Sequence, residues 1–98
     1  MARVRKAERL PHYERASYRA VLKALSTNLR RLRVERAWTQ EQAAAECALS
    51  LIQYARLETD ATNFTALTLS RLGEGFAVTP SALLGSASAT ASATASAT

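Results

Sequence analysis

The sequence predicts an all-α fold, and three observations support this prediction. Apolar residues recur at steps of three and four positions along most of residues 12–84, as they do on one face of a helix. No segment shows the sustained alternation of apolar and polar residues that is typical of a half-buried strand. The chain has 98 residues, which is enough for one hydrophobic core. We therefore expect a single small helical domain.

The first predicted helical region lies between residues 13 and 36. Its apolar residues follow one another at steps of four, three, four and three positions: Tyr18, Leu22, Leu25, Leu29 and Leu32. This series crosses a Ser-Thr-Asn run at residues 26–28, whose side chains favour the capping position before a helix. The pattern is compatible with two helices, at 13–25 and 27–36, or with one long helix. We expect a break or bend near residues 26–28.

Two short helices are predicted next. Thr39 can cap the first of them, which begins at residue 40 and continues through residue 47. After a short turn, Ser50 is a second candidate cap, and it precedes a helix over residues 51–58. These two segments are thus expected to form a pair of helices joined by a tight turn.

Two further helices complete the predicted domain. One covers approximately residues 65–76, with Leu69, Leu72 and Phe76 on one face. The other begins at Thr79-Pro80, because a capping hydroxyl followed by proline is typical of a helix start.

The chain is predicted to have three parts. Residues 1–25 form a basic extension that is partly helical, and residues 26–85 form the helical domain. Residues 86–98 contain only Ser, Ala and Thr, so this tail has little apolar surface to offset the entropy lost on ordering. We expect the tail to be disordered.

Basic residues are concentrated in the first third of the chain. The formal net charge is +5. Residues 1–36 contain eleven Lys and Arg and three Asp and Glu, whereas residues 37–85 contain two basic and five acidic residues. Such a distribution attracts a polyanion to one end of the molecule, although a solvated basic helix would show the same charge.

Several classes of protein are excluded by composition. A single cysteine, Cys47, cannot form a disulfide framework or a multi-cysteine zinc site, and His12 is the only histidine available to a catalytic triad. No stretch has the roughly 20 apolar residues of a membrane span. We therefore expect a cytoplasmic binding protein, not an enzyme, with no metal, no cofactor and no membrane contact.

The residues from Leu29 to Leu84 carry a resemblance to a known family. The matching pieces occur in order and without a gap: Leu29-Arg30-x-Leu32-Arg33, Trp38-Thr39-Gln40-Glu41, Ala44, Leu49-Ser50, Leu57-Glu58, Thr68-Leu69-x-x-Leu72 and Phe76-x-Val78. This series resembles the Cro/lambda-repressor-type helix-turn-helix domain. The spacing of Glu58, Asn63 and Thr65 is also similar to that of restriction–modification controller proteins, while a phage-type repressor or an antitoxin fits about as well.

The resemblance implies a sequence-specific DNA-binding regulator of transcription, and it implies that the chain acts as a homodimer on double-stranded DNA. The first residue of the helix predicted over 40–47 is expected to contact phosphate. The start of the helix predicted over 51–58 is expected to contact bases. Two arginines of the first helix are further phosphate candidates. The expected DNA-binding residues are Gln40, Leu51, Ile52, Gln53, Arg56, Arg30 and Arg31.

Two of these residues depart from the family's pattern. Leu51 and Ile52 occupy positions where the family usually has polar side chains. Apolar side chains can contact thymine methyl groups but cannot form bidentate hydrogen bonds with base edges. The alternative hypothesis is therefore a protein–protein interaction module that binds its partner through this face.

Other residues are expected to have structural roles. Trp38, Cys47 and Tyr54 are predicted to pack in the core. The resemblance implies a partly buried ion pair between Arg33 and Glu58 in place of DNA contacts.

Four small residues are expected to weaken the fold. Ala37 and Ala48 stand where glycine is common, and a left-handed backbone there would cost about 1 kcal/mol or more. Gly73 and Gly75 lie inside a predicted helix, where each would cost roughly 0.5–1 kcal/mol.

Overall fold

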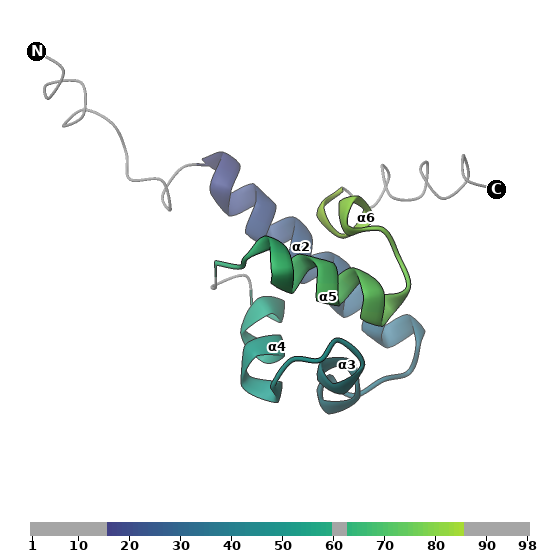
Figure 1. Ribbon diagram of the computed structural model, residues 1–98. Coiled ribbons are helices and arrows are strands. Elements are labelled where there is room, and N and C mark those ends of the chain that lie inside the picture. The colour runs from purple at the N-terminus through teal and green to yellow at the C-terminus, as the bar shows by residue number, and fades with distance from the viewer. Residues whose placement is uncertain (1–15, 60–62, 86–98) are drawn as a thin grey trace, which may run out of the picture.

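The computed structural model describes residues 16–59 and 63–85, and these residues form five helices and no strand. The helices are α2 (Ala16–Glu35), α3 (Gln40–Glu46), α4 (Leu51–Glu58), α5 (Ala66–Phe76) and α6 (Pro80–Leu84). The motif pair α3 and α4 lies at one end of the molecule and α6 at the other (Figure 1). The all-α prediction is confirmed, while the predicted tail at 86–98 lies outside the described residues.

Helix α2 runs without interruption from Ala16 to Glu35, so the predicted break near residues 26–28 is wrong. The hydroxyl of Ser26 donates to the carbonyl of Lys23 within the same helix, at 3.1 Å. The amide nitrogen of Asn28 donates to the carbonyls of Leu83 and Gly85, each at 2.8 Å. Ser26 and Asn28 therefore make their hydrogen bonds from inside one helix and do not cap a helix start. The boundary predicted between the basic extension and the helical domain, at residues 25 and 26, also lies inside α2.

The other helices begin at hydroxyl caps. In α3 the Thr39 hydroxyl accepts from the backbone N–H of Gln42, and the Gln42 side chain accepts from the Thr39 N–H. Ser50 and Gln53 form the same reciprocal pair at the start of α4. These capping boxes satisfy donors that would otherwise be unpaired in the first turn. Thr65 and Thr79 cap α5 and α6 with their hydroxyls.

The core lies between α2, the motif pair and the two C-terminal helices. Its buried side chains are Leu25, Leu29, Leu32, Ala43, Ala44, Cys47, Leu49, Tyr54, Leu57, Leu72, Phe76 and Leu83. Trp38 is partly buried against this cluster, and its ring centroid lies 5.4 Å from that of Phe76. The predicted packing roles of Trp38, Cys47 and Tyr54 are confirmed.

The glycines of α5 have a role that the sequence analysis missed. A Cβ atom at Gly75 would overlap the sulfur of Cys47 and lie 2.8 Å from the carbonyl oxygen of Glu46. A Cβ at Gly73 would lie 2.9 Å from the carbonyl oxygen of Val78. The absence of a side chain therefore lets α5 pack closely against the end of α3 at Gly75 and against the start of α6 at Gly73.

Three alanines adopt the left-handed conformation at the ends of helices. Ala37 and Ala48 both have φ of 57°, as expected from their positions, and Ala77 after α5 has φ of 60°. The conformation of Ala77 was not predicted. Each of these alanines turns the chain toward the next helix, at a position that glycine would occupy with less strain.

Candidate functional site

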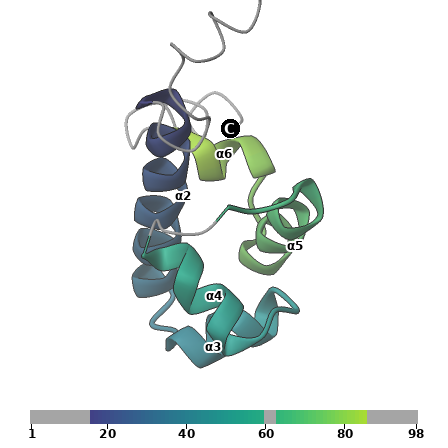
Figure 2. The ribbon, with the colours of Figure 1, turned by 90° about the vertical axis from the view of Figure 1, so that its left-hand side faces the viewer.

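Helix α4 presents one face to solvent and packs its other face against the body of the domain. Tyr54, Leu57 and Glu58 are buried, at 4% exposure or less. Helix α4 packs against α2 and α3, and Figure 2 shows it beside the C-terminal half of α2. The opposite face is therefore a rigidly supported, solvent-exposed surface.

Four of the predicted site residues lie on this exposed face: Leu51, Ile52, Gln53 and Arg56. Leu51 is 42% exposed and Ile52 is 65% exposed, so the first turn of α4 places two apolar side chains in solvent. The Gln53 side chain accepts a hydrogen bond from the Ser50 N–H at 3.1 Å, which fixes its amide oxygen at the start of the helix. All four side chains are therefore exposed within the first two turns of α4.

Gln40 lies at the first position of α3, beside the C-terminal end of α4. Its amide nitrogen donates to Oε1 of Glu58 at 3.0 Å. This contact was not predicted. It holds the side chain of Gln40 between the two helices of the motif.

The carboxylate of Glu58 connects three helices. Arg33 donates to it twice, from Nε at 2.6 Å and from Nη2 at 3.1 Å, so the predicted ion pair is confirmed. The hydroxyl of Tyr54 donates to the same carboxylate at 2.6 Å. The spacing of Tyr54 and Glu58, four residues apart on one helix, is the signal from which this hydrogen bond could have been found.

These contacts change the acidity of the groups involved. Burial on its own would raise the pKa of Glu58, but hydrogen bonds from Arg33, Tyr54 and Gln40 hold that pKa below its ordinary value. The hydrogen bond to Glu58 raises the pKa of Arg33. Burial, together with the hydrogen bond to Glu58, raises the pKa of the Tyr54 hydroxyl. At neutral pH the carboxylate is therefore ionised and the tyrosine is a donor.

Arg30 and Arg31 point about 100° apart around α2, and their surroundings differ. Arg30 is exposed. Arg31 pairs with Glu35 at 3.3 Å and donates to the side-chain oxygen of Asn28, also at 3.3 Å. Since Asn28 also binds the end of α6, Arg31 lies on the flank of α2 that faces α6.

Arg36 is held by the fold. Its Nη2 donates to the carbonyl of Phe76 at 2.6 Å, and its Nη1 donates to that of Leu32 at 3.1 Å. Its guanidinium also lies over the rings of Trp38 and Phe76, 5.7 Å and 5.3 Å from their centroids. The guanidinium of Arg36 therefore connects the C-terminal ends of α2 and α5.

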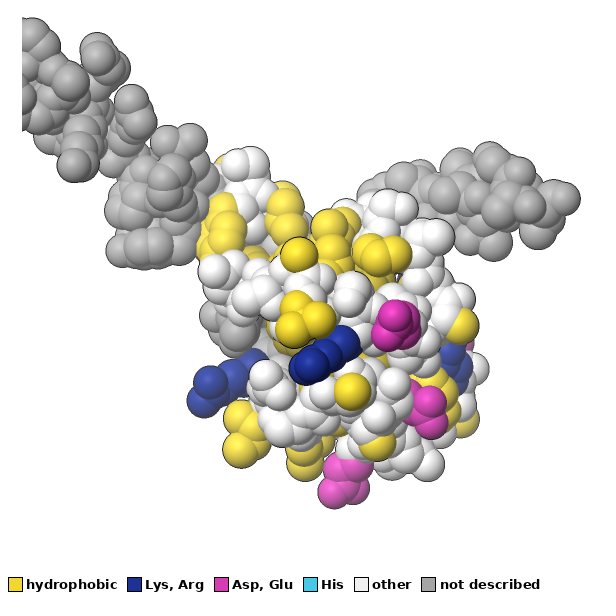
Figure 3. Space-filling model, in the orientation of Figure 1, with side chains coloured by type: hydrophobic (Ala, Val, Ile, Leu, Met, Phe, Trp, Pro, Cys, Tyr) yellow, Lys and Arg dark blue, Asp and Glu magenta, His cyan; other side chains and the backbone are white. Residues whose placement is uncertain are grey.

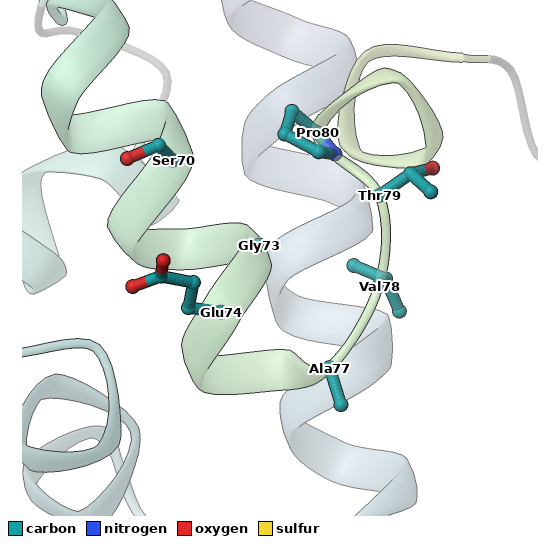
Figure 4. A pocket seen from close by; sticks show the side chains of 7 residues that line it. All are labelled: Ser70, Gly73, Glu74, Ala77, Val78, Thr79 and Pro80. Carbon is teal, nitrogen blue, oxygen red and sulfur yellow. The ribbon is translucent and has the colours of Figure 1, made fainter.

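A separate hollow lies between the C-terminal half of α5 and the start of α6 (Figure 4). It is lined by Ser70, Gly73, Glu74, Ala77, Val78, Thr79 and Pro80. It is open and mainly apolar, and it contains none of the predicted site residues. Within residues 16–59 and 63–85, no group of three or more His, Cys, Asp and Glu side chains is placed to hold a metal ion. No helix in these ranges has the length and apolar character needed to cross a membrane.

Comparisons with known proteins address the fold and the family. A family model described as helix-turn-helix matches residues 29–83. The chain is also similar to a solved structure, described as that of the hypothetical transcription factor NHTF from Neisseria. The identity is 21% and the TM-score is 0.69, over 87% of this chain and 92% of that chain. The search of curated proteins found no match.

Proposed function

Because the chain belongs to the Cro/C1-type helix-turn-helix family, whose members bind double-stranded DNA, we propose that it is a sequence-specific regulator of transcription. The observation that supports this proposal most strongly is the exposed face of α4, which α2 and α3 hold in place through the Glu58 contacts. A helix fits the major groove, which is about 12 Å wide. The second helix of such a motif is the one that enters the groove. We therefore assign α4 as the recognition helix.

In this proposal the first turn of α4 contacts bases. Leu51 and Ile52 would contact thymine methyl groups, and Arg56, one turn later, would bind a guanine edge or a phosphate. Gln53 would contact a base next to those contacted by Leu51 and Ile52. Two apolar contacts and few hydrogen bonds give modest discrimination between bases, so phosphate contacts would supply much of the affinity.

Phosphate contacts are proposed for Gln40 and Arg30. An amide NH₂ group has two hydrogens, and Gln40 donates from this group to Glu58, which leaves a second N–H for a phosphate oxygen. Arg30 is exposed on α2. Arg31 was expected to act in the same way, but its pairing with Glu35 and Asn28 on the other flank of α2 does not support that role.

We further propose a homodimeric repressor that acts in the cytoplasm. The eight residues of α4 span about 12 Å and can cover only a few base pairs. Two copies on half-sites about 34 Å apart would read a longer sequence and so gain specificity. Occupancy of an operator by such a dimer is sufficient to block it.

Selection of bound duplexes from a random-sequence pool tests the proposal. Wild-type protein should enrich a two-fold symmetric sequence. The double variant Leu51→Ser/Ile52→Ser should lose preference for thymine at one or two positions per half-site, while non-specific affinity stays constant. Arg56→Ala should cost about 1–3 kcal/mol at a single base position. Leu67→Ser is the matched control, because Leu67 is 59% exposed but lies on α5.

The exposed pair Leu51 and Ile52 also supports the second candidate function, a protein interaction surface, because exposed apolar groups often mark contacts. Under that function the double serine variant would bind DNA with unchanged sequence preference. A wild-type protein that selects no sequence and shows no affinity for duplex DNA even near 50 mM salt would contradict the DNA proposal.

A further inference from the structure

We propose that one flank of α2 forms a second contact with DNA, made to the phosphate backbone next to the segment that α4 occupies. This inference rests on the proposed function. The flank carries Arg19, Lys23 and Arg30, which we call the α2 basic row. All three side chains are exposed. The row would extend the interface beyond the helix-turn-helix motif itself.

The three residues of the α2 basic row share one side of the helix. Residues four apart differ by about 40° around an α-helix and residues seven apart by about 20° in the other direction, so the three lie within a sector of about 40°. From Arg19 to Arg30 the rise is about 16 Å. Duplex DNA carries one negative charge per about 1.7 Å of its axis, so a row of this length can meet several phosphates.

The other arginines at the C-terminal end of α2 make contacts within the protein, and within the described residues the α2 basic row does not pair in this way. Arg33 pairs with Glu58, Arg36 binds the carbonyls of Phe76 and Leu32, and Arg31 pairs with Glu35. Among residues 16–59 and 63–85, none of the three side chains of the row takes part in an ion pair. Glu35 is the acidic residue of α2, and it lies with Arg31 on the other flank.

The row begins next to the recognition helix. Arg30 precedes Arg33 by three residues, so the two lie on neighbouring turns of one side of α2. Arg33 in turn binds Glu58, the last residue of α4. Figure 2 shows α2 extending past that end of α4. A duplex bound along α4 would therefore contact the α2 basic row where the duplex continues beyond α3 and α4.

The charge pattern favours a polyanion at this flank over the α5 side of the molecule. On the α5 side, acidic side chains lie among the basic ones (Figure 3). The sequence before the row adds more positive charge, since residues 1–15 contain five basic and two acidic residues. Along the sequence the row thus follows the most basic part of the chain, and in the structure Arg30 lies one turn from Arg33, which binds the end of α4.

The test is the salt dependence of binding to a duplex that contains the selected operator with ten flanking base pairs at each end. The full-length variant Arg19→Gln/Lys23→Gln/Arg30→Gln removes the three charges and keeps polar side chains of similar helix propensity. Loss of three phosphate contacts should make the slope of log K against log salt less steep by about 2.7. Between 50 and 200 mM salt, wild-type affinity should therefore fall on the order of 40-fold more than that of the variant.

Two controls distinguish a direct contact between the α2 basic row and phosphate from an effect of the protein's net charge. The variant Arg31→Gln/Arg71→Gln removes two exposed or half-exposed cations from other surfaces, and its slope should remain that of wild type. On a duplex trimmed to the operator, wild type and the triple variant should differ much less, because the flanking phosphates are absent. The melting curve of the triple variant should coincide with that of wild type, and that of the control, which loses the surface pair of Arg31 and Glu35, should shift by only a few degrees.

Three results would overturn the inference. If wild type binds the long duplex with a steep slope and the triple variant has the same slope, the row faces solvent while the proposed function stands. If the triple variant has lost binding to phosphatidylserine vesicles and retains the wild-type slope on DNA, the row serves a membrane surface. If wild type does not bind duplex DNA at 50 mM salt, the proposed function fails and the inference fails with it.

Discussion

The carboxylate of Glu58 is 3% exposed and accepts four hydrogen bonds, from Arg33, Tyr54 and Gln40. A buried charge is expensive unless such donors surround it. Because the donors come from α2, α3 and α4, one side chain sets the position of α4 relative to α2 and α3. It also holds Gln40 at the start of α3, where we propose a phosphate contact.

Replacing this carboxylate should affect stability and its pH dependence. Glu58→Gln leaves the charge of Arg33 unpaired, and we expect a loss of about 3 kcal/mol in the free energy of unfolding at pH 7. The folded-state pKa of Glu58 is lowered, so its stabilisation is complete above the unfolded pKa of about 4.3 and is lost as the pH falls through the lower folded-state pKa. Urea unfolding between pH 7 and pH 3 measures both effects.

The variant should therefore lose less stability than wild type as the pH falls below about 4.3. Glu35→Gln is the control, because Glu35 pairs with Arg31 on the surface, and such pairs contribute about 0.3–0.5 kcal/mol. Identical acid profiles for wild type and Glu58→Gln would show that another group governs stability in this range.

At the scale of the element, helix ends explain the short lengths of α3, α4 and α5. Each begins at a hydroxyl cap, and α3 and α5 are followed by an alanine with positive φ. The left-handed conformation costs a non-glycine residue about 1–2 kcal/mol. The turn between α3 and α4 therefore keeps its shape because the surrounding packing stabilises it, with Leu49 buried directly after Ala48.

Glycine should relieve this strain. We expect Ala48→Gly to stabilise the protein by about 0.5–1 kcal/mol and to raise Tm by several degrees, because glycine adopts φ of 57° without a clash between Cβ and the carbonyl. Differential scanning calorimetry gives the measurement. Ala45→Gly, at an exposed position inside α3, should lower stability by up to 1 kcal/mol, so opposite signs for the two variants are the diagnostic result. A lower Tm for Ala48→Gly would contradict this account of the turn.

At the scale of the whole molecule, the two ends of the chain differ in charge and should differ in function. Residues 1–15 carry five basic and two acidic side chains, whereas residues 86–98 carry none of either. Long-range attraction to DNA depends on net charge, so these two segments should contribute unequally to binding.

Two truncations test this difference. Removal of residues 1–15 retains α2 from Ala16 and should make the salt dependence of DNA binding less steep. Removal of residues 86–98 should leave the slope and the melting temperature unchanged. Fluorescence anisotropy across a salt series measures the slopes. Equal slopes for both truncations would mean that the N-terminal segment does not meet phosphate.

Much of the domain could be predicted because its signals are local. The positions of α3, α4, α5 and α6 follow from hydroxyl caps and three- and four-residue spacing, which depend on neighbours along the chain. The buried ion pair of Arg33 and Glu58 and the exposure of Leu51 and Ile52 were also expected, since a matched motif places those positions relative to the core.

Other features depend on partners far away in the sequence. Ser26 to Asn28 has the composition of a helix start, yet α2 continues through it because Asn28 binds carbonyls 55 and 57 residues later. Gly75 lies against Cys47, which directly follows α3, and Arg36 donates to the carbonyl of Phe76. The linear pattern therefore specifies which segments are helical and which face is apolar. Packing between the helices assigns each polar group its partner, because a hydrogen bond depends on distance in space and not on separation along the chain.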